Sequence, residues 1–174
     1  MKQTAFAAIF ALTVVSSVVG ADRGLSFAVG LSPQTGIAYA AGLDPGLSGL
    51  ALEAMGQISL DGLVAELGVE SGTSPLGWQM LFPLRAGLRW GESAFHATAA
   101  LEVSPGLSLT RPALFMLGLG GAARIDWRLA PRFGLYAGIG LRITLCPAYR
   151  NFTGIAYQSL DIPLALGVRW QLSP

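Results

Sequence analysis

Apolar and polar residues alternate with a period of two along most of this 174-residue chain. Successive side chains of a β-strand point to opposite faces of the sheet, so the alternation predicts strands with one aliphatic face and one face of small and charged residues. The alternating segments cover residues 25–32, 50–60, 63–70, 82–90, 95–104, 117–128, 133–144 and 160–172. The expected fold class is therefore all-β, with eight antiparallel strands.

All the charged residues inside these segments fall on the face opposite the aliphatic one. They are Glu53, Glu66, Glu70, Arg85, Arg89, Glu102, Arg124, Asp126, Arg128, Arg142, Asp161 and Arg169. A soluble β-sandwich would bury the aliphatic face and expose the other one to water. Only 12% of the residues are charged and 23 are glycine, so that water-facing surface would be unusually poor in charge. A transmembrane barrel reverses the faces, with aliphatic side chains toward lipid and polar ones in the lumen.

The connections between the segments alternate between short and long. Asp61-Gly62 is the pair favoured by a two-residue type I′ hairpin, in which both residues have positive φ. Short connections are expected at residues 61–62, 91–93 and 130–132, and long ones at about 33–49, 72–80, 105–112 and 147–157. This alternation is typical of barrels with periplasmic turns and extracellular loops. Residues 34–49 also fit an extension of the first strand.

Aromatic residues gather where the strands meet the short turns. Amphipathic rings favour the membrane interface, so a group at one height indicates an aromatic girdle. The residues expected in this periplasmic-side girdle are Trp90, Phe95, Trp127, Phe133 and Trp170. Together, these features predict an eight-stranded antiparallel up-and-down transmembrane β-barrel.

The first 21 residues have the pattern of a secretory signal peptide. Met1-Lys2 is followed by an uncharged apolar stretch over residues 4–15, and Val19 and Ala21 are small residues suited to a cleavage site before Asp22. We therefore expect export and a single barrel domain over residues 22–174. The one cysteine, Cys146, excludes an internal disulfide.

The last segment, residues 160–172, alternates regularly and has an aromatic residue, Trp170, near its end. With the patterns above, the chain resembles the small eight-stranded outer-membrane barrels of diderm bacteria, the class of the OmpA transmembrane domain and the OmpX and OmpW proteins. The resemblance implies an outer-membrane location, contact with outer-membrane lipids and insertion by the barrel-assembly machinery. The chain departs from the class by ending in Trp170-Gln-Leu-Ser-Pro174 rather than in a terminal phenylalanine.

The lumen of such a barrel is just wide enough for side chains to fill it, so the inward acids and arginines are expected to pair. Two functions follow: a narrow pore or transport channel, or a structural and surface-contact protein with a salt-bridged plug. The long loops could contact an extracellular ligand through Trp78, Tyr149, Arg150, Phe152 and Tyr157. The alternative class is a soluble periplasmic β-sandwich or β-barrel binding protein.

Composition argues against several other classes. A hydrophobic share of 52% excludes a disordered chain, and 11 basic against 10 acidic residues give no net field for nucleic acid. No Cys/His cluster offers metal ligands, and we expect no cofactor. His96 is the only histidine, and Ser93 and Glu92 nearby form no nucleophile–base spacing. We therefore expect no enzymatic activity, a lipid-modifying outer-membrane enzyme being the remote alternative.

The charge pattern generates a first prediction. Arg124→Ala removes one charge from the densest inward cluster, so we expect lower heat stability or higher conductance than in the wild type. Thermal unfolding and planar-bilayer recording measure the two quantities. If neither changed, the inward charges would not form a network.

Overall fold

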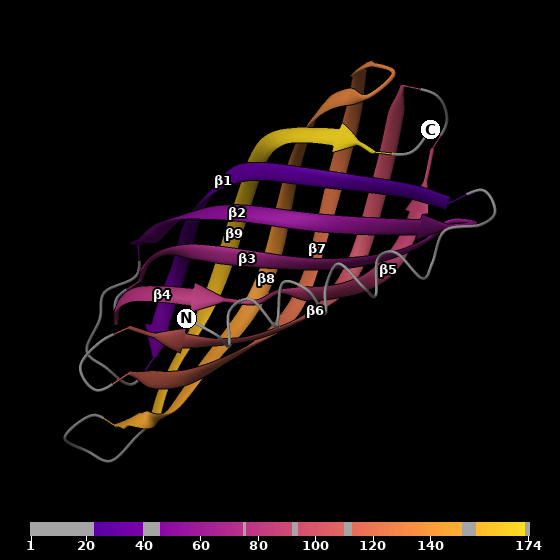
Figure 1. Cartoon of the computed structure of the whole chain (residues 1–174). Coiled ribbons are helices and arrows are strands. Elements are labelled where there is room, and N and C mark those ends of the chain that lie inside the picture. Colours follow the sequence, from indigo (N-terminus) through magenta and orange to yellow (C-terminus); the bar gives the residue numbers. More distant parts are fainter. Residues whose placement is uncertain are drawn as a thin grey trace, which may run out of the picture.

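The computed structural model describes residues 23–39, 46–74, 76–91, 94–109, 113–150 and 156–172. The predicted signal peptide, residues 1–21, lies outside them. All nine elements of the described part are antiparallel strands (Figure 1). They are β1 (Arg23–Tyr39), β2 (Gly46–Leu60), β3 (Leu63–Ser74), β4 (Gly77–Leu81), β5 (Leu84–Trp90), β6 (Phe95–Ser108), β7 (Leu114–Ala130), β8 (Phe133–Arg150) and β9 (Ala156–Gln171). In this part of the chain, no helix is long and apolar enough to cross a membrane.

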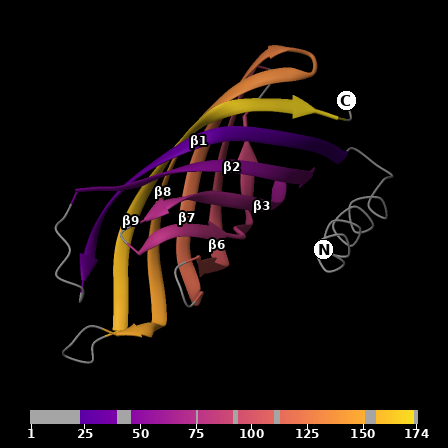
Figure 2. The same ribbon diagram turned by 60° about the vertical axis from the view of Figure 1, so that its left-hand side comes forward.

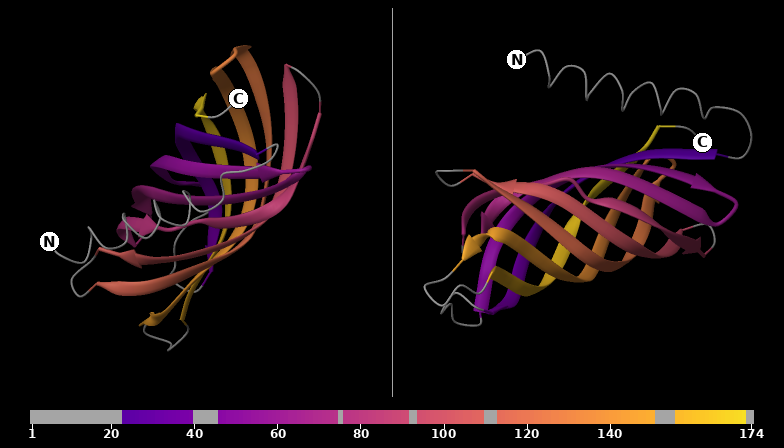
Figure 3. Two further views of the ribbon diagram at one scale, coloured as in Figure 1. Left: turned by 45° about the vertical axis from the view of Figure 1, so that its right-hand side comes forward. Right: turned by 90° about the horizontal axis from the view of Figure 1, so that it is seen from below.

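The strands close into a barrel. Consecutive strands pair with one another from β1 to β4 and from β5 to β9. β1 then pairs with β9 and completes the ring. Strands β4 and β5 occupy one position, because both lie between β3 and β6. The ring therefore has eight positions, and closure leaves no open sheet edge. Figures 2 and 3 show the tilted strands winding around the barrel axis. The predicted eight-stranded antiparallel barrel is confirmed.

Phe82 and Pro83 separate β4 from β5. Proline has no N–H to donate to a strand ladder, so it interrupts the pairing locally. The carbonyl of Pro83 still accepts a hydrogen bond from the Gly68 N–H at 2.9 Å. The residues before the interruption were predicted as a loop over 72–80, and this prediction is wrong: β3 continues to Ser74 and β4 begins at Gly77.

The other connections at the same end are also shorter than predicted. β1 runs to Tyr39, so residues 33–39 extend the first strand, and β6 and β8 run to Ser108 and Arg150. These extensions keep backbone pairing with neighbouring strands although their sequences lack a clean alternation of apolar and polar residues. Backbone pairing, which is independent of side-chain type, explains why the periodicity did not predict them.

The two faces of the wall are inverted relative to a soluble protein. Exposed large apolar side chains come from all the described strands, and Leu101 reaches 78% exposure. Charged and hydroxyl side chains are buried inside, with Glu70 and Arg142 each at 1%. The direction assigned to each face from the sequence therefore agrees with the structure.

The turn between β2 and β3 has the predicted geometry. Asp61 has φ of 43° and Gly62 has φ of 83°, both positive as a type I′ turn requires. Two further turns lie at this end. The turn between β5 and β6 contains Glu92 and Ser93, which lie outside the described residues, and Pro131-Arg132 joins β7 to β8. We call this end of the barrel the short-turn end and the opposite one the loop end.

Gly62→Ala tests the turn. A Cβ at this positive φ is strained, so we expect the free energy of unfolding to fall by about 1 kcal/mol. Gly56→Ala is the matched control, because its added Cβ would meet only the Leu67 carbonyl oxygen, at 3.9 Å. Urea unfolding of both variants in detergent micelles provides the measurement. Equal stability of the two variants would contradict the role of Gly62.

Candidate functional site

A network of buried ion pairs fills the middle of the lumen. Its members come from β3, β5, β6, β7, β8 and β9, so it links strands on opposite sides of the barrel. We call it the charge network, and it consists of Glu66, Glu70, Arg85, Glu102, Arg124, Asp126, Arg142 and Arg169.

Arg142 is the most enclosed cation of the charge network. Its Nη2 lies 2.9 Å from Glu70 Oε1 and its Nη1 lies 3.0 Å from Glu70 Oε2, which makes the pair bidentate. The same Nη1 lies 3.3 Å from Glu102 Oε1, so one guanidinium joins two acids. The neighbouring strand makes room for it, because a Cβ on Gly118 would lie 2.8 Å from Arg142 Cδ.

The other three arginines continue the charge network toward the short-turn end. Arg85 Nε lies 2.6 Å from Glu102 Oε2, and its Nη1 lies 3.7 Å from Glu66 Oε2. Arg124 also pairs with Glu66. Arg169 Nη1 lies 3.0 Å from Asp126 Oδ2. An unpaired buried ion costs several kcal/mol, so each of these ions depends on its partners for stability.

Tyr136 joins the lumen interior, although the sequence analysis did not single it out. Its hydroxyl donates a hydrogen bond to Glu53 Oε1 at 2.6 Å. The guanidinium carbons of Arg124 and Arg169 lie 5.6 Å and 6.0 Å from the centre of its ring, within cation–π range. The available signal was its place on the inward face of residues 133–144, among glycines, Arg142 and Thr144.

The remaining predicted lumen charges lie outside the charge network. Glu53 accepts the Tyr136 hydrogen bond described above. Asp161 accepts hydrogen bonds from Thr144 at 2.8 Å and Ser159 at 2.9 Å. Arg89 Nη1 lies 3.5 Å from the Ser59 hydroxyl, and Arg128 is exposed at the short-turn end.

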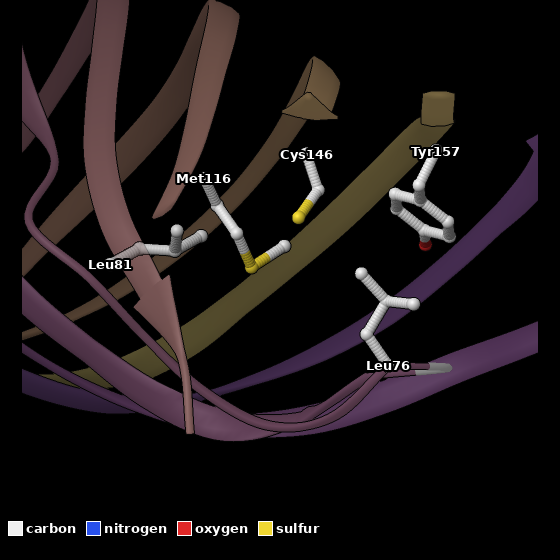
Figure 4. Close-up of a cluster of buried hydrophobic side chains, with 5 residues drawn as sticks. All are labelled: Leu76, Leu81, Met116, Cys146 and Tyr157. Atoms are coloured by element: carbon white, nitrogen blue, oxygen red, sulfur yellow. The ribbon is translucent and has the colours of Figure 1, made fainter. Parts of the chain in front are cut away.

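An apolar cluster occupies the lumen at the loop end. Four of its side chains come from β4, β7, β8 and β9 and one from the turn between β3 and β4, and they converge on one interior space (Figure 4). All are at most 6% exposed: Leu76, Leu81, Met116, Cys146 and Tyr157. The prediction that Tyr157 is an exposed loop contact is therefore wrong. Tyr157 belongs to β9 with the same inward orientation as Asp161, so the strand turns its ring away from the surface.

The other predicted loop contacts lie mainly on strands. Trp78 is exposed on β4, and its indole N–H donates to the Ser71 hydroxyl at 3.1 Å. Tyr149 on β8 packs edge-on against Tyr157, with ring centres 6.1 Å apart. Arg150 ends β8, and Phe152 lies outside the described residues.

Four of the five aromatic residues predicted at the short turns form two pairs. Phe95 and Trp127 stack with ring centres 5.8 Å apart, and Phe133 meets Trp170 edge-on at 5.5 Å. Trp90 is 54% exposed at the end of β5. The strand ends therefore carry adjacent rings that point outward.

Within the described residues, no group of His, Cys, Asp or Glu side chains is arranged to hold a metal ion. His96 lies half-buried on β6, opposite Asp126 of β7. That acid already interacts with Arg124 and Arg169.

Comparison with known proteins identifies the fold. The chain matches no family model and no curated protein. The crystal structure of Neisserial surface protein A (NspA), an eight-stranded barrel, superposes with a TM-score of 0.59 at 14% identity, covering 85% of this chain and 97% of that one. The CymD monoaromatic hydrocarbon channel gives a TM-score of only 0.28 at 12% identity, covering 83% and 55% of the two chains. The NspA match supports the barrel architecture.

Arg142→Met tests the charge network. It leaves Glu70 and Glu102 with less neutralising charge in a buried setting, and we expect about 3–5 kcal/mol of destabilisation. Adding Glu70→Gln to this variant should restore part of the loss, because it removes the stranded charge. Urea unfolding midpoints measure both effects.

The control is Arg128→Met, which removes one positive charge from an exposed position. Its free energy of unfolding should change by less than about 1 kcal/mol. If Arg142→Met cost no more than this control, the buried pairs would not stabilise the barrel.

Proposed function

We propose that the chain is an outer-membrane β-barrel protein whose lumen is closed to solutes and which acts as a structural and surface-contact protein. The observation that carries the proposal is the filled lumen. The charge network connects opposite walls in the middle, and the apolar cluster closes the loop end. A solute would have to break several buried ion pairs to pass.

The outer face supports the membrane location. Exposed apolar side chains come from all the described strands of the ring, and monomeric soluble proteins rarely expose an apolar patch of this extent. A closed barrel also satisfies the backbone hydrogen bonds that lipid cannot. We accordingly propose that Trp90, Phe95, Trp127, Phe133 and Trp170 form the periplasmic-side girdle, with outer-membrane lipids around the barrel. Membership of the OmpA, OmpX and OmpW class, with insertion by the barrel-assembly machinery, belongs to the same proposal.

Surface contact would occur at the loop end. Trp78 on β4 and Tyr149 on β8 are exposed there, beside the apolar cluster. Exposed aromatic side chains are common centres of protein contacts. The proposal includes no catalytic role, because the acid opposite His96 is held by two arginines.

A narrow pore is the second candidate, and one observation favours it. A small space of about 20 Å³ lies beside Glu53, Arg85 and Arg124, where β8 contributes Gly138 and Gly140 instead of side chains. A space of this size holds about one water molecule. A water path along the charge network would carry ions but exclude larger solutes.

Planar-bilayer recording of the purified chain decides between the two candidates. We expect no steady single-channel steps from the wild type. The double variant Glu70→Ala/Arg142→Ala removes the bidentate buried pair, and Glu102 keeps Arg85 as its partner, so the variant should open small, steady steps. Arg128→Ala, outside the charge network, is the control and should remain silent.

Steady steps from the wild type would contradict the closed lumen and favour the pore. The soluble alternative is tested in the same preparation. A membrane barrel needs detergent to refold and migrates differently on a gel after heating, whereas a monomer that folds in plain buffer would contradict the membrane location.

A further inference from the structure

A recess lined by arginines opens at the short-turn end of the barrel, at the edge of the charge network. Its lining comes from β5, β6, β7, β8, β9 and the turn between β7 and β8. The charged and titratable residues of this mouth recess are Arg89, His96, Asp126, Arg128, Arg132 and Arg169.

The mouth recess has an excess of positive charge. Four arginines line it against one acid, and that acid is already paired with Arg169 at 3.0 Å. In the part of the chain that the structure describes, no carboxylate lies within 4 Å of Arg89, Arg128 or Arg132. Uncompensated cations in a concave site raise the local concentration of anions.

Several donors in the mouth recess lack acceptors. The Nε atoms of Arg89 and Arg169 and the Nη2 of Arg169 are buried, and among the described residues none of them donates a hydrogen bond. Glu66 Oε1 lies 4.0 Å from Arg169 Nη2, beyond hydrogen-bond distance. Buried donors normally have acceptors, so these atoms are available to an acceptor group that enters the recess, although both carboxylate oxygens of Asp126 in the same lining also lack a hydrogen bond within the described part of the chain.

The backbone keeps the space between the arginines open. Gly134 of β8 lies directly between Arg128 of β7 and Arg169 of β9. A Cβ on Gly134 would lie 2.7 Å from the Trp127 carbonyl oxygen, so a larger residue does not fit without a shift of the wall. The recess measures about 30 Å³, room for about two water-sized atoms, so it can take part of the oxygens of one small anionic group.

We propose that the mouth recess binds a phosphate group. Guanidinium groups pair with phosphate oxygens through parallel N–H donors, and several arginines around one recess match the three oxygens of a terminal phosphate. The source of the phosphate rests on the proposed function. Trp127 and Phe133 line the same recess and belong to the proposed girdle, which lies at the height of lipid headgroups.

Calorimetric titration of the refolded full chain tests the proposal. One arm adds inorganic phosphate to the chain in uncharged detergent micelles, and the other adds phosphatidylglycerol to the same micelles. We expect saturable binding in at least one arm, weakened about tenfold by Arg128→Gln and by Arg132→Gln. Arg150→Gln, which removes the same charge at the far end of β8, should leave binding within about twofold.

Binding in the phosphate arm supports a free-ion site, and binding only in the lipid arm supports a headgroup site. Absence of saturable binding in both arms, with a chain shown to be folded by its heat-dependent gel migration, would overturn the proposal. An equal loss in Arg150→Gln would overturn it as well, because the effect would then be one of net charge. Steady channel steps from the wild type would remove the closed lumen and leave the phosphate result standing.

Discussion

The narrowness of an eight-position ring governs this structure. Such a ring leaves an interior only as wide as the side chains that fill it, so each charge on the inner face must be neutralised by another inner side chain rather than by bulk water. Arg142 satisfies this requirement for Glu70 and Glu102 together, and Glu66 is shared by Arg85 and Arg124. Size must match as well as charge, and Gly118 stands where a side chain would meet Arg142. The glycine content and the segregated charge therefore have one physical cause.

The same constraint gives the interior three zones along its axis. The loop end excludes water with the apolar cluster around Met116, the middle is neutral because its ions are paired, and the short-turn end carries arginines without described acid partners. The position of the excess charge follows from solvent access, since an unpaired guanidinium is tolerated only where water or an anion can reach it. The paired middle and the basic mouth thus both follow from the difference in solvent access along the barrel.

The sequence was sufficient for the wall of the barrel but not for its full height. Period-two alternation located all the ring positions, and Asp61-Gly62 located one turn with its positive φ values. The wall is predictable because a one-residue slip would exchange the lipid and lumen faces, so each strand must show the pattern. At the loop end the alternation of apolar and polar residues is less regular. Residues 33–39 pair through their backbone without a regular alternation, and Tyr157 looked like a loop aromatic although β9 turns it inward.

The pairing of the inner charges could not be derived from the same pattern, and the Glu53–Glu70 pair shows why. These acids lie directly opposite each other on β2 and β3, an arrangement that should be destabilising if only neighbouring strands mattered. The structure resolves the conflict across the lumen. Tyr136 and Arg142 of β8 reach Glu53 and Glu70 respectively, and Gln34 of β1 also donates to Glu70. Contacts between side chains on opposite sides of the lumen depend on the stagger of the strands when the sheet closes. The alternation within a single strand does not determine this stagger. The sequence thus specifies which charges enter the lumen, and closure of the barrel determines which of them meet.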